Sequence, residues 1–316
     1  MRERPGGASA RDGVLVVGSI SADLTAFAGR LPAPGETILG DGFTLVLGGK
    51  GANQAIAASL AGAPARMVGC VGSDLFRGLV TDGLRDAGVD VSQVRRVPGP
   101  TGIAHIRVDE SGENDIVVVP LANAALDEAQ IDRAFAELAE RSAVLLTQLE
   151  IPFAVTGHAI RRAHDAGMTV VLDPAPAHEL DDAIWPLVDI VTPNETEAAL
   201  LSGIRVADRG SAVEAGRWFL GKGAGAALIT LAGAGAVLVD AGGVQDFPAL
   251  PVDAVDTTAA GDAFAGYLAA GLAQGLARAD AVRRASAAGA LTVTKRGASP
   301  SLPASAEVDA LLAAHG

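Results

Sequence analysis

The stretch that decides the fold is Val255-Asp256-Thr257-Thr258-Ala259-Ala260-Gly261-Asp262-Ala263-Phe264-Ala265-Gly266. It follows an extended segment that contains two prolines, and it begins an apolar pattern typical of a long helix. The first turn of a helix carries unpaired N–H groups and the positive end of the helix dipole, so small residues there predict an anion site, above all for phosphate. Asp262 lies among these donors. It could cap the helix, which is the commoner use of such an aspartate, or it could take the proton from a hydroxyl group held against the phosphate.

Strands and helices alternate along the rest of the chain. The apolar run Val14–Ile20 has the profile of a buried strand, and further strand and helix patterns follow in turn up to a last helix at 305–314. This alternation predicts an α/β fold with a mostly parallel central sheet and helices on both faces.

Two pairs of short strands interrupt the alternation. One pair lies within 34–47 around a glycine turn, and the other is a hairpin formed by 101–109 and 114–119. A hairpin is unexpected inside a parallel α/β chain. We therefore expect the two pairs to form a small β lid over the end of the main sheet.

The chain shows no Pro- or Ser-rich linker and no internal repeat, which favours a single domain. We expect this domain to cover 13–314, with the β lid inserted from about 34–48 and 100–120. Residues 1–12 are expected to be a flexible N-terminus.

The composition limits the function. The 316 residues carry a net charge of −13, which argues against nucleic acid and anionic membranes as partners. The single cysteine, Cys70, excludes an intrachain disulfide framework and a cysteine-based zinc site. The first apolar run is too short for a signal peptide, and no stretch of about 18 apolar residues could span a membrane. We therefore expect a cytoplasmic protein.

Polar residues follow several of the predicted strands, at the edge where open α/β sheets bind ligands. Capping alone could account for one such ending, but several together favour a common site. These endings are Ser21-Ala22-Asp23, Gln148-Leu149-Glu150, Asp173, Asn194-Glu195-Thr196-Glu197 and Thr230.

A glycine-rich run, Gly48-Gly49-Lys50-Gly51-Ala52-Asn53-Gln54-Ala55, opens the first predicted helix. Glycines allow backbone to approach a ligand closely, and a lysine with an asparagine can bind sugar hydroxyls as donors and acceptor. The run is not a P-loop, because Thr44 and Gly51 stand where that motif needs glycine and serine or threonine.

The motifs of this chain resemble those of the PfkB carbohydrate kinases. The run Gly48–Ala55 resembles their first signature, in a version close to that of the ribokinase branch, and Asp256–Asp262 resembles their second. The motifs 148–150, 194–197 and 295–301 match in the same order, so the resemblance covers about 13–313. It implies a ribokinase-like three-layer sandwich, with a mostly parallel central sheet flanked by helices. The small β lid would join two chains into a homodimer, as it does in ribokinases.

The resemblance also implies an ATP-dependent sugar kinase. Asp262 would accept the proton of a primary hydroxyl as it attacks the γ-phosphate, and the N–H groups of Ala259, Ala260 and Gly261 would hold the developing charge. Such donors are worth roughly 3 kcal/mol each. The implied partners are a small sugar and ATP, with neither nucleic acid nor membrane.

The remaining roles are carried over by motif. The residues implied to bind sugar are Asp23, Gly49, Lys50, Asn53, Glu150 and Asp262. Those implied to bind ATP are Asn194, Thr230, Gly233, Gly235 and Gly261. Mg²⁺ would be held through water by Glu197, since this ion keeps several waters. K⁺ would be held beside the anion site at Asp256, Thr258, Thr292, Lys295, Gly297 and Ser301.

Three positions depart from the family pattern. Ser21 stands where ribokinases commonly carry asparagine, and Leu121 and Ala232 replace glycines usual in neighbouring loops. The Ser21 change leaves the identity of the sugar substrate open. We expect D-ribose, phosphorylated to D-ribose 5-phosphate; the alternatives are a nucleoside, fructose or deoxy-sugar kinase of the same family, or a non-catalytic sugar-binding protein. An NAD-dependent oxidoreductase is disfavoured because no dinucleotide fingerprint stands in its proper context.

Overall fold

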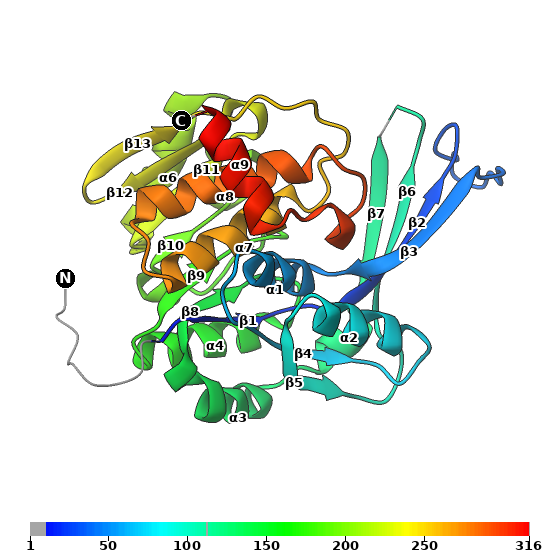
Figure 1. The fold of residues 1–316 in the computed structure, drawn as a ribbon, viewed down its shortest axis with the longest axis horizontal. Helices are drawn as coiled ribbons and strands as arrows, with labels where there is room; N and C mark the ends of the chain where they lie inside the picture. The colour runs from blue at the N-terminus through cyan, green and yellow to red at the C-terminus, as the bar shows by residue number, and fades with distance from the viewer. Residues whose placement is uncertain (1–10, 112, 316) are drawn as a thin grey trace.

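The computed structural model describes residues 11–111 and 113–315, and its ribbon shows a central sheet between two layers of helices (Figure 1). The expected flexible N-terminus falls almost entirely on residues 1–10, outside the described part. Arg11, which was included in it, donates hydrogen bonds to the carbonyl of Ala166 and to the carboxylate of Glu140.

The central sheet has nine strands in the order β13-β12-β11-β10-β9-β8-β1-β4-β5. The pairs from β11 to β5 are parallel, while β12 and β13 run antiparallel at one edge. The bounds are β1 Gly13–Val17, β4 Ala65–Val71, β5 Asp90–Arg96, β8 Ser142–Thr147, β9 Thr169–Leu172, β10 Ile190–Val191, β11 Ala226–Thr230, β12 Ala236–Asp240 and β13 Gly243–Phe247. The predicted mostly parallel sheet is confirmed.

Strand β1 shows why both faces of the sheet are covered. Its side chains alternate, so Val14 and Val16 lie in one hydrophobic core and Leu15 and Val17 in the other. The first core packs against α1 Lys50–Leu60, α2 Phe76–Asp86, α7 Ala260–Ala273, α8 Arg278–Thr292 and α9 Ser305–His315. The second packs against α3 Glu128–Leu138, α4 Phe153–Asp165, α5 Glu195–Ser202 and α6 Arg209–Lys222.

A separate four-stranded sheet, in the order β3-β2-β6-β7, projects from the carboxyl ends of the central strands (Figure 1). Its strands are β2 Ser21–Phe27, β3 Gly42–Gly48, β6 Gly102–Val108 and β7 Asn114–Val119. We call this sheet the lid.

The prediction of two strands within 34–47 was wrong. Only β3 lies there, and its partner is β2, which is separated from β1 by three residues. The stretch Ser21–Phe27 alternates polar and apolar side chains, which is the period of a strand, but Asp23 within it was interpreted as a polar residue just past the end of the first strand. Asp23 therefore reaches the site from a lid strand.

None of the helices in the described part of the chain is both long and apolar enough to cross a membrane.

Candidate active site

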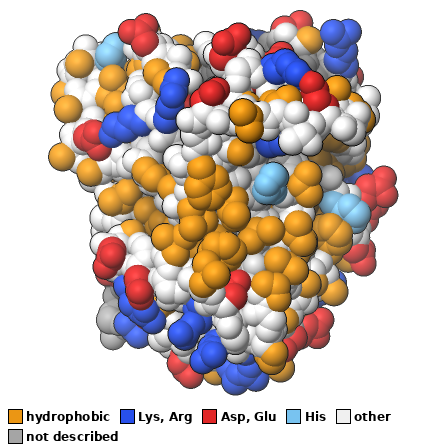
Figure 2. Space-filling model, turned by 90° about the vertical axis from the view of Figure 1, so that its right-hand side faces the viewer, with side chains coloured by type: hydrophobic (Ala, Val, Ile, Leu, Met, Phe, Trp, Pro, Cys, Tyr) orange, Lys and Arg blue, Asp and Glu red, His pale blue; other side chains and the backbone are white. Residues whose placement is uncertain are grey.

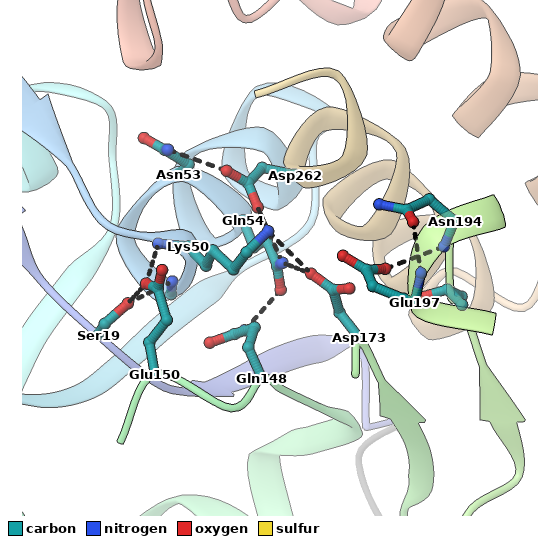
Figure 3. A network of polar contacts seen from close by, with 12 residues as sticks. Ser19, Lys50, Asn53, Gln54, Gln148, Glu150, Asp173, Asn194, Glu197 and Asp262 are labelled. Atoms are coloured by element: carbon teal, nitrogen blue, oxygen red, sulfur yellow. Dashed lines mark hydrogen bonds and ion pairs between the residues drawn. The ribbon is translucent and has the colours of Figure 1, made fainter. Parts of the chain in front are cut away.

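The polar side chains expected at the strand ends meet where α1 and α7 begin, above the carboxyl ends of β1, β8 and β9 (Figure 3). The lid strand β2 contributes Asp23, and the start of α5 contributes Asn194 and Glu197. Segments that are far apart in the sequence therefore supply one site. Hydrogen bonds and ion pairs connect Lys50, Gln54 and Asp262 with their neighbours, and the Asn194–Glu197 pair lies beside this network (Figure 3).

Asp262 is the third residue of α7 and is buried. Its Oδ2 accepts a hydrogen bond from Asn53 Nδ2 at 3.0 Å, and its Oδ1 accepts one from Gln54 Nε2 at 3.0 Å. The helix begins after Ala259, which has a left-handed φ of 61°. A non-glycine residue in this conformation is strained by roughly 1–2 kcal/mol, and such strain concentrates at functional sites.

Lys50 lies between two carboxylates. Its Nζ is 3.8 Å from Asp173 Oδ2 and 3.9 Å from Asp262 Oδ1. Burial lowers the pKa of Lys50, but the nearby carboxylates, Asp173 and Asp262 foremost, outweigh that effect and the pKa is raised. Lys50 is therefore a cation held beside the start of α7.

Two buried carboxylates in the network are hard to ionise. Burial raises the pKa of Asp173 to about 7, although the Lys50 ammonium opposes the shift. Burial also raises the pKa of Asp23 to about 6, against a hydrogen bond from the Ser21 hydroxyl and with the help of the Glu150 and Asp262 charges. Perturbed carboxylates gathered in one place are typical of functional sites.

The glycines before α1 are required by close approach and backbone conformation. A Cβ at Gly48 would lie 2.0–2.2 Å from the Asp23 carboxylate, and Gly49 has a φ of 90°. Glu150 fixes the turn that precedes α1. Its Oε2 accepts hydrogen bonds from Ser19 Oγ at 2.6 Å and from the N–H of Lys50 at 3.1 Å.

A cavity of about 730 Å³ opens beside the first turn of α7. Its walls come from β11, the loops on either side of β12 and β13, and the start of α7 with one face of α8. All five residues expected to bind ATP line it, namely Asn194, Thr230, Gly233, Gly235 and Gly261. Asn194 also caps α5, because its side chain accepts from the N–H of Glu197 while Glu197 accepts from the N–H of Asn194.

Residues 11–305 match the model of the pfkB family of carbohydrate kinases. The chain belongs to this family. It is 40% identical to the ribokinase of Haemophilus influenzae over 93% of this chain and 96% of that one, and 34% identical to the deoxyribokinase of Salmonella typhi over 92% and 95%. The structure of Arabidopsis thaliana ribokinase complexed with ribose and ATP matches with a TM-score of 0.87, at 31% identity over 95% of this chain and 98% of that one. The predicted family, ribokinase-like fold and enzyme class, an ATP-dependent carbohydrate kinase, are confirmed.

The residues expected to hold K⁺ in this carbohydrate kinase lie before the start of α7 and at and after the end of α8, and they form two groups. The first group is Asp256, Thr258 and Gly297. The Asp256 carboxylate connects them, because it accepts hydrogen bonds from the N–H and hydroxyl of Thr258 and from the N–H of Gly297. In the second group the side chains are engaged elsewhere: Thr292 and Ser301 donate to main-chain carbonyls, and Lys295 pairs with Glu307. The second group therefore offers main-chain oxygens to an ion.

Sequence reasoning left four members of the kinase site without a role. Each stood in a stretch that had been singled out, either beside β1, in the glycine-rich run or at a strand end. They are Ser19, Gln54, Gln148 and Asp173.

The two departures at Leu121 and Ala232 have a conformational meaning. Both residues have a positive φ, 47° for Leu121 and 42° for Ala232. Glycine reaches this region without strain, which explains why it is usual at these positions of the family.

Proposed function

We propose that the chain transfers the γ-phosphoryl group of ATP to the primary hydroxyl of D-ribose, giving D-ribose 5-phosphate and ADP. The observation that carries the proposal is Asp262, a buried carboxylate between two amide donors at the bare start of α7, next to the 730 Å³ cavity. A sugar bound over Asp262 and a nucleotide in the cavity would meet at this helix end.

Each bond change has a residue to serve it. The sugar oxygen attacks the γ-phosphorus, the bond from that phosphorus to the β–γ bridging oxygen breaks, and the proton passes to Asp262. A carboxylate is a weak base, which suits a loose transition state in which the proton leaves late. The Lys50 ammonium and the N–H groups of Ala259, Ala260 and Gly261 would stabilise the negative charge. The N–H of Ala260 now reaches the carbonyl of Thr257 at 3.3 Å, a long bond that a phosphate would replace.

The sugar would bind among side chains that still have bonding capacity. Within the described part of the chain, Asn53 Oδ1 is buried without a partner, so it is suited to accept a hydroxyl proton. Asp23 and Glu150 supply further acceptors, and Gly49 lets the backbone approach. Nucleotide phosphates would lie against Asn194, Thr230 and Gly261, with Gly233 and Gly235 leaving room beside them.

The proposal includes two ions. Mg²⁺ would be held by the phosphates, by waters and by Glu197, because this ion keeps several waters and needs few carboxylates. When bound, Mg²⁺ neutralises phosphate charge. The oxygen-rich turn at Asp256, Thr258 and Gly297, with main-chain oxygens near Thr292, Lys295 and Ser301, fits K⁺. Equal rates in potassium and sodium buffers would remove the K⁺ part of the proposal.

We also propose that the lid joins two chains into a homodimer in the cytoplasm. Apolar side chains gather on the face of the molecule that carries the lid (Figure 2). The exposed members on lid strands lie on both faces of the lid: Ile116 and Val118 on the face that carries Asp23, and Phe43, Val117 and Val119 on the other. Exposed apolar surface of this kind marks an interface more often than bare surface. Sedimentation should give a dimer, and Val117→Asp should give monomers.

One screen tests the proposed activity. ADP release is measured with D-ribose, 2-deoxy-D-ribose, D-fructose and nucleosides, and the products are identified by mass. D-ribose should give the highest kcat/KM. Sugar binding without ADP release from any of them would indicate a non-catalytic sugar-binding protein.

A second candidate is phosphorylation of 2-deoxy-D-ribose. It is favoured by Ser21, whose hydroxyl is bonded to Asp23 and reaches less far than the usual asparagine, and by the deoxyribokinase relative. Ser21→Asn separates the two candidates. If deoxyribose is the native sugar, the variant should shift kcat/KM toward ribose; if ribose already leads in the wild type, the ratio should change little.

A further inference from the structure

Gln54 is the side chain on which the polar network converges. It is completely buried on α1 and follows the sugar-binding candidate Asn53. Its Nε2 donates to Asp173 Oδ2 at 2.7 Å and to Asp262 Oδ1 at 3.0 Å, and its Oε1 accepts from Gln148 Nε2 at 2.5 Å (Figure 3).

These three bonds fix the orientation of the Gln54 amide. Both N–H groups face carboxylates, and the carbonyl oxygen faces the N–H of Gln148. Rotating the amide by half a turn would aim its oxygen at Asp173 and Asp262 and its nitrogen at another amide nitrogen. Such a buried arrangement leaves several polar groups unpaired, so only one orientation is stable.

The two oxygens of Asp262 are consequently unequal. Oδ1 is held by Gln54, which has no freedom to move. Oδ2 is held by Asn53, whose own carbonyl oxygen is buried and unpartnered, so an arriving hydroxyl gives Asn53 a new bond to form.

We propose that Gln54 is a positioning residue that clamps Oδ1 of Asp262, so that Oδ2 is the oxygen that receives the proton. The inference rests on the proposed kinase function and adds to it the orientation of the base. Gln148 and Asp173 hold the clamp from behind. Without the clamp, Asp262 would be misplaced relative to the sugar hydroxyl and the rate would fall. The substrates would still bind, because their binding uses other groups.

The test uses Gln54→Met, which keeps the length of the side chain and removes its three hydrogen bonds. The expected result is a 10- to 100-fold lower kcat with KM for sugar and for ATP within about threefold of the wild type. The acid limb of the kcat–pH profile should move to higher pH, because the charged form of the base loses a donor. A residue with a structural role alone would lower the melting temperature and leave that limb in place.

Gln148→Met is the second variant, since it leaves the bonds from Gln54 to both carboxylates intact and frees only the far side of the amide. It should show the same changes in weaker form, and it keeps the inference testable if Gln54→Met does not fold. Active wild type with unchanged kcat and pH profile in the folded variants would overturn the inference and leave the kinase assignment intact. A wild type that phosphorylates no sugar would overturn both.

Discussion

The two halves of the site are built from different materials. The half proposed to bind the sugar, the sugar half, is a network of charged and amide side chains in which Lys50, Gln54, Asp173 and Asp262 contact one another. The half proposed to bind the nucleotide, the nucleotide half, is a cavity lined mainly by glycines, alanines and aliphatic side chains. Polar partners fix the first half in place before any ligand arrives, while the second is defined by its shape.

This difference matches the two ligands that the family description and relatives suggest. A small sugar offers only hydroxyl groups, so its recognition needs side chains that donate and accept in fixed directions. A nucleotide offers a flat base and a charged phosphate chain, which apolar walls and backbone N–H groups accommodate. Substitutions in the sugar half should therefore change turnover, and substitutions in the nucleotide half should change affinity for ATP.

The largest expected effect is that of Asp262→Asn. The variant keeps the shape of the side chain but loses the proton acceptor, so kcat should fall at least a hundredfold, in line with the ~10²–10⁴-fold typical of positioned base catalysis. Sugar affinity measured by calorimetry should stay within about threefold. Asp246→Asn is the matched control, because Asp246 is exposed and pairs with Arg209 away from the site. Near-normal turnover would remove Asp262 from its proposed role.

A substitution in the nucleotide half should separate the two halves. Ala290 lines the cavity from α8, so Ala290→Leu should fill part of the space and raise KM for ATP about tenfold, which corresponds to ~1.4 kcal/mol. The kcat at saturating ATP and the KM for sugar should stay within about twofold. Ala313→Leu, on the exposed side of α9, is the control. An effect on sugar affinity instead would show that the halves are not independent.

The two halves of the site also differ in how far the sequence predicts them. The sequence pointed to the proposed sugar half through residue types and through the family resemblance, because Lys50, Asn53 and Glu150 stand at a strand end or in a glycine-rich run that matches a family motif. Ala290 and Val293 were not found, because small apolar residues on a helix have the same pattern whether they face a core or a cavity.

Some elements of the fold were likewise predicted from the sequence, and others were missed. Buried strands were predicted from continuous apolar runs, and helices from their period. Strand β5, Asp90–Arg96, was missed because it is an edge strand with polar and charged side chains. Strand β2 was missed because Asp23 was interpreted as the polar ending of the strand before it.

Asp23 is expected to reduce stability in exchange for function. Its pKa in the folded state is about 6, above the usual 3.8, so its contribution to the free energy of unfolding is complete below pH ~4 and is lost as the pH rises through 6. Asp23→Asn should therefore be more stable than the wild type at pH 8, by about 1–3 kcal/mol, with the gain absent at pH 4. Urea unfolding at both pH values measures the difference, and equal gains would contradict this origin. Sugar binding should be lost, while ATP affinity should remain.

The smallest expected effect concerns the strained start of α7, where the two halves meet. Ala259 has a φ of 61°, which strains a residue with a Cβ by roughly 1–2 kcal/mol, whereas glycine adopts it freely. Glycine also gives the unfolded chain more freedom, at a cost of about 0.4–1 kcal/mol. Ala259→Gly should therefore raise the free energy of unfolding by about 0.5 kcal/mol. Ala310→Gly, in the exposed middle of α9, should lower it by up to about 1 kcal/mol, since that alanine is helical. If both variants lose the same stability in urea, Ala259 is not strained; if Ala259→Gly is more stable yet slower in turnover, the strain serves the anion site.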